Sequence, residues 1–218
     1  MSQARKRPEP DVDHLDPRLN HLAMSDDAQP LFAAVKKHIV ENVAPIEEEF
    51  HRLGEGRKDR WSWAPGQLEL LETAKNKAKA SGLWNFFLPH TAIGRGLTNL
   101  DYAYIAAELG KHPLASESLN CSAPDTGNME VIERVGTPAQ KERWLKPLLN
   151  GEIRSAYAMT EPNVASSDAK NISTRAELVG DEWVINGEKY YISGAGDPRC
   201  KIMIVMVKSS PNAAAQFQ

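Results

Sequence analysis

The sequence changes its hydrophobic period at one short stretch, residues 157–168, which reads Tyr-Ala-Met-Thr-Glu-Pro-Asn-Val-Ala-Ser-Ser-Asp. Before this stretch, apolar residues recur every three or four positions, which is typical of amphipathic helices. After it, the segments have the length and alternation of β-strands. The two periods predict a helical part followed by a β part, with this stretch at their junction.

The junction itself is predicted to end a strand and continue as a hydroxyl-rich loop. Pro162 cannot donate a hydrogen bond to a sheet, and it biases Glu161 toward an extended conformation. Turn-forming polar residues follow, namely Asn163, Ser166, Ser167 and Asp168. Composition alone favours an ordinary loop here, because Ser and Asp are common in any turn.

Composition suits a soluble globular protein of one or two domains. The 218 residues are 41% hydrophobic and 25% charged, and the formal net charge of -3 gives no reason to expect a nucleic-acid partner. Cys121 and Cys200 lie far apart and share no metal-ligand spacing, so we predict free thiols, no metal site and no secretion. No apolar run approaches the roughly 20 residues of a membrane span.

Residues 1–24 are polar and interrupted by prolines, and we expect a disordered tail. The first helix is predicted to start at residues 25–27 and to carry one apolar stripe. The stripe consists of Leu31, Val35, Ile39, Val43, Ile46 and Phe50. Pro45 lies inside it and should kink the helix or split it near Glu41.

Further helices are indicated by stop and start signals. One stripe over residues 68–78 should end at Gly82, and its basic run Lys75, Lys77 and Lys79 is interpreted as a solvated face. A helix should begin at Thr98 or Asn99, and residues 137–140 (Thr-Pro-Ala-Gln) match a capping box. We expect the loop residues Trp61 and Trp63 to pack on the helices. The helical domain is predicted to span residues 25–153.

Residues 120–128 are short and polar, Asn-Cys-Ser-Ala-Pro-Asp-Thr-Gly-Asn. They could form a buried hydrogen-bonded cluster near a ligand, or they could simply cap a helix. The sequence alone favours capping.

Residues 154–218 are predicted to form a partial β domain. Strands are expected over 171–179, 182–185, 188–192 and 201–208, with a turn at Gly180-Asp181 after the first. Asn186-Gly187 favours a type I′ hairpin between the second and third of these. Strand alternation would then place Tyr191 and Ser193 on one face, and Tyr190 and Ile192 on the other.

Residues 160–162 (Thr-Glu-Pro) with 166–168 (Ser-Ser-Asp) resemble the flavin-binding signature of the acyl-CoA dehydrogenase family. The wider family has one residue fewer between the Glu and the Asp. The version here is similar to the branch that includes family members ten and eleven. Residues 189–193 (Lys-Tyr-Tyr-Ile-Ser) match the family's second flavin contact, with Tyr191 where Trp is usual and Ser193 where Thr is usual. The resemblance covers about residues 25–208.

The resemblance implies an α+β fold, with an N-terminal all-helical domain followed by an incomplete β-barrel or sandwich domain. It implies FAD-dependent dehydrogenation of an acyl-CoA, with electron-transferring flavoprotein or oxygen as electron acceptor, and a homo-oligomer. Mitochondrial or peroxisomal localisation is implied, and a cytoplasmic one stays open. The implied cofactor-binding residues are Tyr157, Met159, Thr160, Ser166, Ser167, Tyr191, Ile192 and Ser193, of which Ser167 would also touch the substrate.

The family's catalytic base is a carboxylate from a C-terminal helical domain, so no catalytic residue is predicted within these 218 residues. Glu161 belongs to the strand-end motif instead. Two hypotheses remain. The chain is part of an acyl-CoA dehydrogenase, or it is a non-catalytic truncated paralogue that binds a partner or acyl-CoA. We expect these residues alone to bind FAD weakly or not at all, and not to dehydrogenate acyl-CoA.

Overall fold

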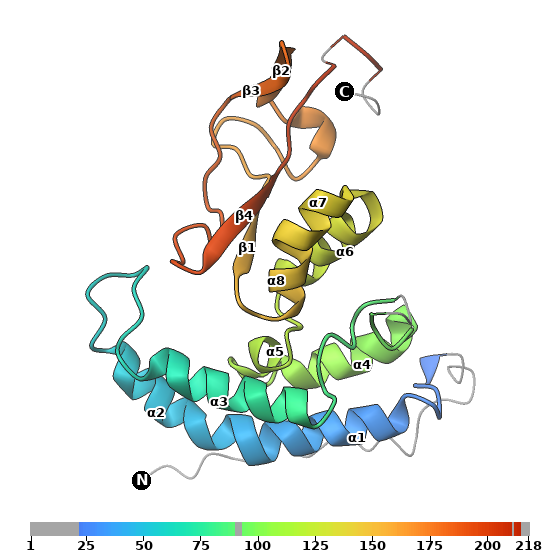
Figure 1. Cartoon of the computed structure of the whole chain (residues 1–218), viewed down its shortest axis with the longest axis vertical. Helices are drawn as coiled ribbons and strands as arrows, with labels where there is room; N and C mark the ends of the chain where they lie inside the picture. Colours follow the sequence, from blue (N-terminus) through green and yellow to red (C-terminus); the bar gives the residue numbers. More distant parts are fainter. Residues whose placement is uncertain (1–21, 90–92, 211, 215–218) are drawn as a thin grey trace.

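The computed structural model describes residues 22–89, 93–210 and 212–214. Helices form one end of the molecule and short strands the other (Figure 1). The predicted order, a helical domain followed by a partial sheet domain, is confirmed. No closed barrel forms within the described ranges, where the strands make two separate two-stranded sheets. Most of the tail predicted over residues 1–24 lies outside the described residues.

The helical part contains long helices joined by short ones. They are α1 (Gln29–His38), α2 (Ala44–Gly54), α3 (Gln67–Ala80), α4 (Asn99–Leu109), α5 (Ala115–Ser118), α6 (Asp125–Val135), α7 (Pro138–Gln140) and α8 (Lys146–Leu149). Single π-helical turns, Ile39–Val43 and Lys141–Leu145, connect α1 to α2 and α7 to α8. No helix among the described residues is long and apolar enough to cross a membrane.

The first apolar stripe builds much of the helical core. Leu31, Val35, Ile39, Val43 and Phe50 are all buried. The expected break before Pro45 is confirmed as the π-helical turn Ile39–Val43, because proline cannot supply the backbone hydrogen bond that an α-helix needs there.

Local capping chemistry follows the sequence at two helix starts and departs from it at the start of α1. The Thr98 side chain accepts a hydrogen bond from the Asp101 N–H, and the capping box of Thr137 and Gln140 is present. The start predicted at residues 25–27 is wrong in detail. No side chain caps α1, and the Ser25 N–H instead donates to the Asp101 carboxylate at 2.8 Å.

Lys75 corrects the prediction of a solvated basic face. Its side chain is buried, and its ammonium lies 2.8 Å from Glu72 and 3.2 Å from Glu117. Glu117 comes from α5, so this pairing depends on tertiary packing that no pattern within α3 reveals.

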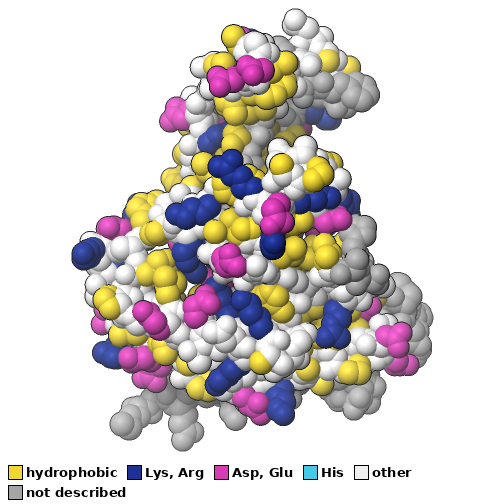
Figure 2. Space-filling model, in the orientation of Figure 1, with side chains coloured by type: hydrophobic (Ala, Val, Ile, Leu, Met, Phe, Trp, Pro, Cys, Tyr) yellow, Lys and Arg dark blue, Asp and Glu magenta, His cyan; other side chains and the backbone are white. Residues whose placement is uncertain are grey.

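Two pairs of strands make up the β part. Strand β1 (Arg154–Ala158) runs parallel to β4 (Cys200–Val205), and β2 (Arg175–Val179) runs antiparallel to β3 (Glu182–Asn186). Strand β2 starts later than predicted because residues 169–171 form a 3₁₀ turn. Figure 2 shows apolar side chains exposed over the β2–β3 hairpin at the top of the molecule.

The predicted Asn186-Gly187 hairpin is wrong. The turn predicted at Gly180-Asp181 is confirmed and makes the hairpin, and the Gly180 φ of +66° suits the first position of this two-residue loop. Gly187 allows its backbone to pass close to Thr174, since a Cβ at this position would lie 2.3 Å from the Thr174 hydroxyl oxygen. Residues 188–192 therefore form no strand, and Tyr191 has a φ of +54°. The prediction that Tyr191 and Ser193 share one strand face fails with it.

The polar residues at the start of α6 form the buried cluster that the sequence left as the less favoured alternative. Pro124 precedes α6 and provides no side-chain cap. Asp125 instead accepts hydrogen bonds from the backbone N–H and hydroxyl of Ser155, at 2.8 and 2.6 Å. Asn128 donates to the Ser155 hydroxyl and the Ala156 carbonyl. This cluster attaches β1 to the helical part.

Candidate functional site

Two segments singled out in the sequence, residues 157–168 and 189–193, lie side by side. The Lys189 ammonium donates to the Glu161 carboxylate at 2.8 Å and to the Met159 carbonyl at 2.9 Å. The Tyr190 N–H donates to the Thr160 carbonyl at 3.1 Å. The loop after β1 and the segment after β3 are thus held as one unit.

Glu161 is the anchor of this unit. The residue is buried, and its carboxylate accepts hydrogen bonds from the backbone N–H and hydroxyl groups of both Ser173 and Thr174, besides Lys189. Burial alone would raise the pKa of this carboxyl, but the bonds from Lys189, Ser173 and Thr174 together hold its pKa far below the usual range. A carboxylate so fully hydrogen-bonded holds a proton poorly, so Glu161 is suited to structure and not to proton abstraction.

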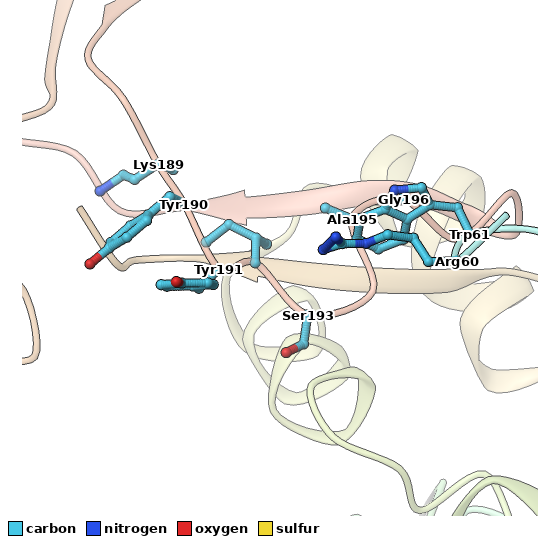
Figure 3. Close-up of a pocket in the computed structure, with 9 residues that line it drawn as sticks. Arg60, Trp61, Lys189, Tyr190, Tyr191, Ser193, Ala195 and Gly196 are labelled. Atoms are coloured by element: carbon cyan, nitrogen blue, oxygen red, sulfur yellow. The ribbon is translucent and has the colours of Figure 1, made fainter. Parts of the chain in front are cut away.

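A pocket of about 650 Å³ opens beside this unit. Its lining residues are Arg60, Trp61, Lys189, Tyr190, Tyr191, Ile192, Ser193, Ala195 and Gly196 (Figure 3). The rings of Tyr190 and Tyr191 lie 4.5 Å apart at one end. Tyr191 is 85% exposed, and the Ser193 hydroxyl makes no hydrogen bond to any described residue. An aromatic face and an open hydroxyl are therefore both free to meet a ligand.

The opposite end of the pocket comes from the helical part, which the sequence did not indicate. Arg60 and Trp61 lie in the loop between α2 and α3. Trp61 is 46% exposed and lies against Gly196, which corrects the expectation that it packs on the helices. The same expectation is confirmed for Trp63, which is half-buried with its ring 6.0 Å from that of Phe50. No motif marks Arg60 or Trp61 as site residues.

A second hollow, of about 270 Å³, shares Ser193 with the first and lies next to a buried ionic network. Glu117 is the centre of this network: Arg199 pairs with it at 2.6 Å, and Arg154 bonds both Glu117 and Asp125. Burial alone would raise the pKa of Glu117, but Arg154, Arg199 and Lys75 together lower it. The network fixes the ends of β1 and β4, and the loop between Ser193 and Arg199, to the helical part.

Comparison with known proteins identifies the family. Residues 25–152 match the family model described as acyl-CoA dehydrogenase, N-terminal domain, and residues 156–218 match acyl-CoA dehydrogenase, middle domain. The chain belongs to the acyl-CoA dehydrogenase family. The resemblance seen in the sequence is thereby confirmed.

Similar proteins include acyl-CoA dehydrogenase family member 10 of Mus musculus, 48% identical, and family member 11 of Gallus gallus, 45% identical. Each match covers 89% of this chain, but only 18% and 24% of those relatives. The solved structure of an acyl-CoA dehydrogenase homologue from Mycobacterium abscessus is 46% identical, with a TM-score of 0.78, over 88% of this chain and 48% of that one. The chain thus spans less than half the length of each.

In this member of the acyl-CoA dehydrogenase family, the predicted cofactor-binding residues fall into two sets. Tyr191, Ile192 and Ser193 line the larger pocket, whereas residues 157–167 of the loop do not. Thr160 and Ser167 are exposed in that loop, Tyr157 is 38% exposed and Met159 is half-buried. Ser166 is buried, and its hydroxyl accepts the Glu161 N–H at 2.8 Å, so its side chain supports the loop.

Proposed function

We propose that the chain takes part in FAD-dependent α,β-dehydrogenation of an acyl-CoA thioester. The observation that carries this proposal is the joining of two flavin-signature segments by Lys189 and Glu161, beside a pocket lined by Tyr191 and Ser193. These residues fit a flavin. The exposed Tyr191 ring offers a face to a flat heterocycle, the Ser193 hydroxyl is open, and about 650 Å³ lies within the range of ordinary small-molecule sites.

The chain's own residues would hold and orient the cofactor. The hydroxyls of Thr160 and Ser193 would hydrogen-bond the flavin ring, and Tyr191 and Ile192 would lie against it. Bound FAD would supply the acceptor for the hydride that leaves the β carbon. Tyr157, Met159, Ser166 and Ser167 would follow the ring edge and the ribityl-phosphate path. The Ser166 N–H already donates to the Val164 carbonyl, and its hydroxyl accepts the Glu161 N–H, so Ser166 would act there through its hydroxyl proton.

On the substrate side, Ser167 is proposed to touch the acyl-CoA. The α proton needs a positioned base. No described side chain that lines the larger pocket is acidic, and Glu161 is already saturated with hydrogen bonds. We therefore propose that the base comes from outside the described residues. Electron-transferring flavoprotein or oxygen would reoxidise the flavin, and a homo-oligomer is the proposed assembly.

Flavin titration of the purified 218-residue chain tests the proposal. FAD should bind with quenching of its fluorescence, and Tyr191→Ala should raise the dissociation constant about five- to tenfold, because stacking contacts of this kind contribute roughly 1 kcal/mol. Trp183→Ala is the matched control, since it removes a ring that is 58% exposed on β3, away from the pocket. Equal affinities for the parent chain and Tyr191→Ala, or no FAD binding at all, would overturn the proposal.

The position of the base is tested by adding octanoyl- or palmitoyl-CoA to the FAD-loaded chain. With the base outside the 218 residues, the visible flavin absorbance should persist. Bleaching on addition of the thioester would instead show that a working base lies within the 218-residue chain.

A further inference from the structure

Arg60 projects into the larger pocket. Figure 3 shows its guanidinium reaching toward the middle of the pocket, from the end opposite Tyr190 and Tyr191. It forms no ion pair with any described residue, and its contact is with the Trp61 ring, whose centre lies 5.0 Å away. The adjacent Asp59 carboxylate is engaged by the N–H groups of Trp61 and Ser62.

The other cations around the two hollows are neutralised. Lys189 is paired with Glu161 at 2.8 Å, and Arg199 with both Glu117 and Asp197 at 2.6 and 2.8 Å. Since the lining of the larger pocket contains no acidic side chain among the described residues, Arg60 leaves it with an uncompensated positive charge. An anionic group of a ligand is the complement that such a charge favours.

The position of Arg60 depends on Trp61, and that of Trp61 on Gly196. A Cβ at Gly196 would lie 2.2 Å from the Trp61 ring, so only glycine lets the ring occupy this place. The ring face in turn holds the guanidinium through a cation–π contact. Loop residues of the helical part and of the β part therefore combine to aim one cation at the pocket.

We propose that Arg60 binds a phosphate group of the ligand in this pocket, with Trp61 as the wall that orients the guanidinium. A planar guanidinium matches two oxygens of a phosphate ester in parallel hydrogen bonds. This inference rests on the proposed function, under which two phosphate-bearing ligands meet the chain, the flavin dinucleotide and the acyl-CoA. Both carry the same phosphate-ester chemistry, and the experiment separates them.

The experiment compares ligands with and without phosphate. The parent chain, Arg60→Gln and Lys58→Gln are titrated with FAD, riboflavin, coenzyme A and pantetheine. Arg60→Gln should raise the dissociation constant about tenfold for FAD or for coenzyme A. The dissociation constant of the matching phosphate-free ligand, riboflavin or pantetheine, should stay unchanged. A loss confined to FAD assigns the contact to the dinucleotide, and a loss confined to coenzyme A assigns it to the substrate. Lys58 is exposed in the same loop but outside the pocket lining, so its variant controls for net charge.

A second variant tests the geometry without altering charge. Gly196→Ala should displace the Trp61 ring and with it Arg60, and should weaken the same phosphate-bearing ligand severalfold while riboflavin or pantetheine binds as before. Tryptophan fluorescence should report the movement of Trp61. An unchanged far-ultraviolet circular dichroism spectrum would show that the chain still folds.

Several results would overturn the inference. One is that Arg60→Gln weakens FAD and riboflavin binding equally. Another is that Arg60→Gln and Lys58→Gln change the dissociation constants equally, and a third is that Arg60→Gln changes none of them. If Tyr191→Ala loses FAD while Arg60→Gln retains every ligand, the proposed function stands and this inference alone fails. If the parent chain binds none of the four ligands, both fail.

Discussion

The Lys189 ammonium lies 2.8 Å from a carboxylate oxygen of Glu161, and both side chains are buried, at 11% and 1% exposure. The pair joins the loop after β1 to the segment that carries Tyr191 and Ser193. The main effect of this ion pair is to position the two segments, because a buried ion pair adds little net stability to a fold. Removal of one partner is nevertheless costly, since it leaves the other charge buried and unpaired. The positions of Tyr191 and Ser193 therefore depend on Glu161, whose carboxylate is occupied by hydrogen bonds within the protein.

Glu161→Gln should lower the free energy of unfolding by about 3 kcal/mol or more, because it leaves the buried Lys189 charge without its counterion. Denaturant titration measures the change. The same variant should weaken FAD binding, since residues 189–193 lose their tether. Glu49→Gln is the control: it breaks an exposed pair with Arg52 and should leave stability unaltered. A Glu161→Gln chain as stable as its parent would contradict the anchoring role.

The environment of His38 should make the free energy of unfolding depend on pH near neutrality. The Ser118 hydroxyl donates to the Ala115 carbonyl, so His38 Nε2 is placed to donate to Ser118, and Nδ1 is placed to accept from Asn42. This arrangement requires a neutral ring. Burial, and secondly the charge of Lys77, lower the pKa of His38 below its usual 6.5.

Because the folded pKa of His38 is depressed, the unfolded chain binds the additional proton first. The free energy of unfolding should therefore be highest above about pH 6.5 and fall as the pH drops through that value, by at most about 1.4 kcal/mol per pH unit. Denaturant titrations of the parent chain and of His38→Gln check this. The variant should show a shallower slope, and parallel curves would exclude His38 as the source.

Local chemistry could be predicted from the sequence, and long-range pairing could not. The caps at Thr98 and Thr137 and the break before Pro45 depend on residues within one or two helical turns, and all are present. The burial of Lys75 could not be predicted, because its partner Glu117 lies on a different helix. The sequence could not favour the buried cluster at the start of α6 over capping, because the partner residue, Ser155, lies on β1.

Only part of the candidate site could be predicted from the sequence. The family signature gave Tyr191, Ile192 and Ser193, which do line one pocket, but strand alternation assigned their faces wrongly. Asn186-Gly187 resembles a hairpin turn in sequence, yet Gly187 is required by the nearby Thr174 hydroxyl. Arg60 and Trp61 carry no local signal at all, because only the packing of Trp61 on Gly196 brings them to the pocket.

Glu117 should be the most costly single charge to remove between the helical and β parts. Glu117→Gln leaves Arg154, Arg199 and Lys75 short of a shared counterion in a largely buried place, and we expect a loss of about 3–5 kcal/mol in the free energy of unfolding. Glu130→Gln, which breaks a 3.8 Å pair on the surface of α6, is the control and should change stability little. Comparable losses in both variants would argue against a central role for Glu117.

Ser193 should bond the flavin through its hydroxyl. It lines the pocket, makes no hydrogen bond to a described residue, and stands where the family usually has Thr. Ser193→Ala should therefore slow reduction of the flavin by acyl-CoA about tenfold in an active flavoprotein that contains this chain, and raise the FAD dissociation constant of the chain itself. Ser193→Thr keeps a hydroxyl at the same position and should retain both properties. Stopped-flow absorbance measures the first property and fluorescence titration the second. If Ala and Thr behave alike, the effect belongs to packing around the pocket and the hydroxyl is not a flavin contact.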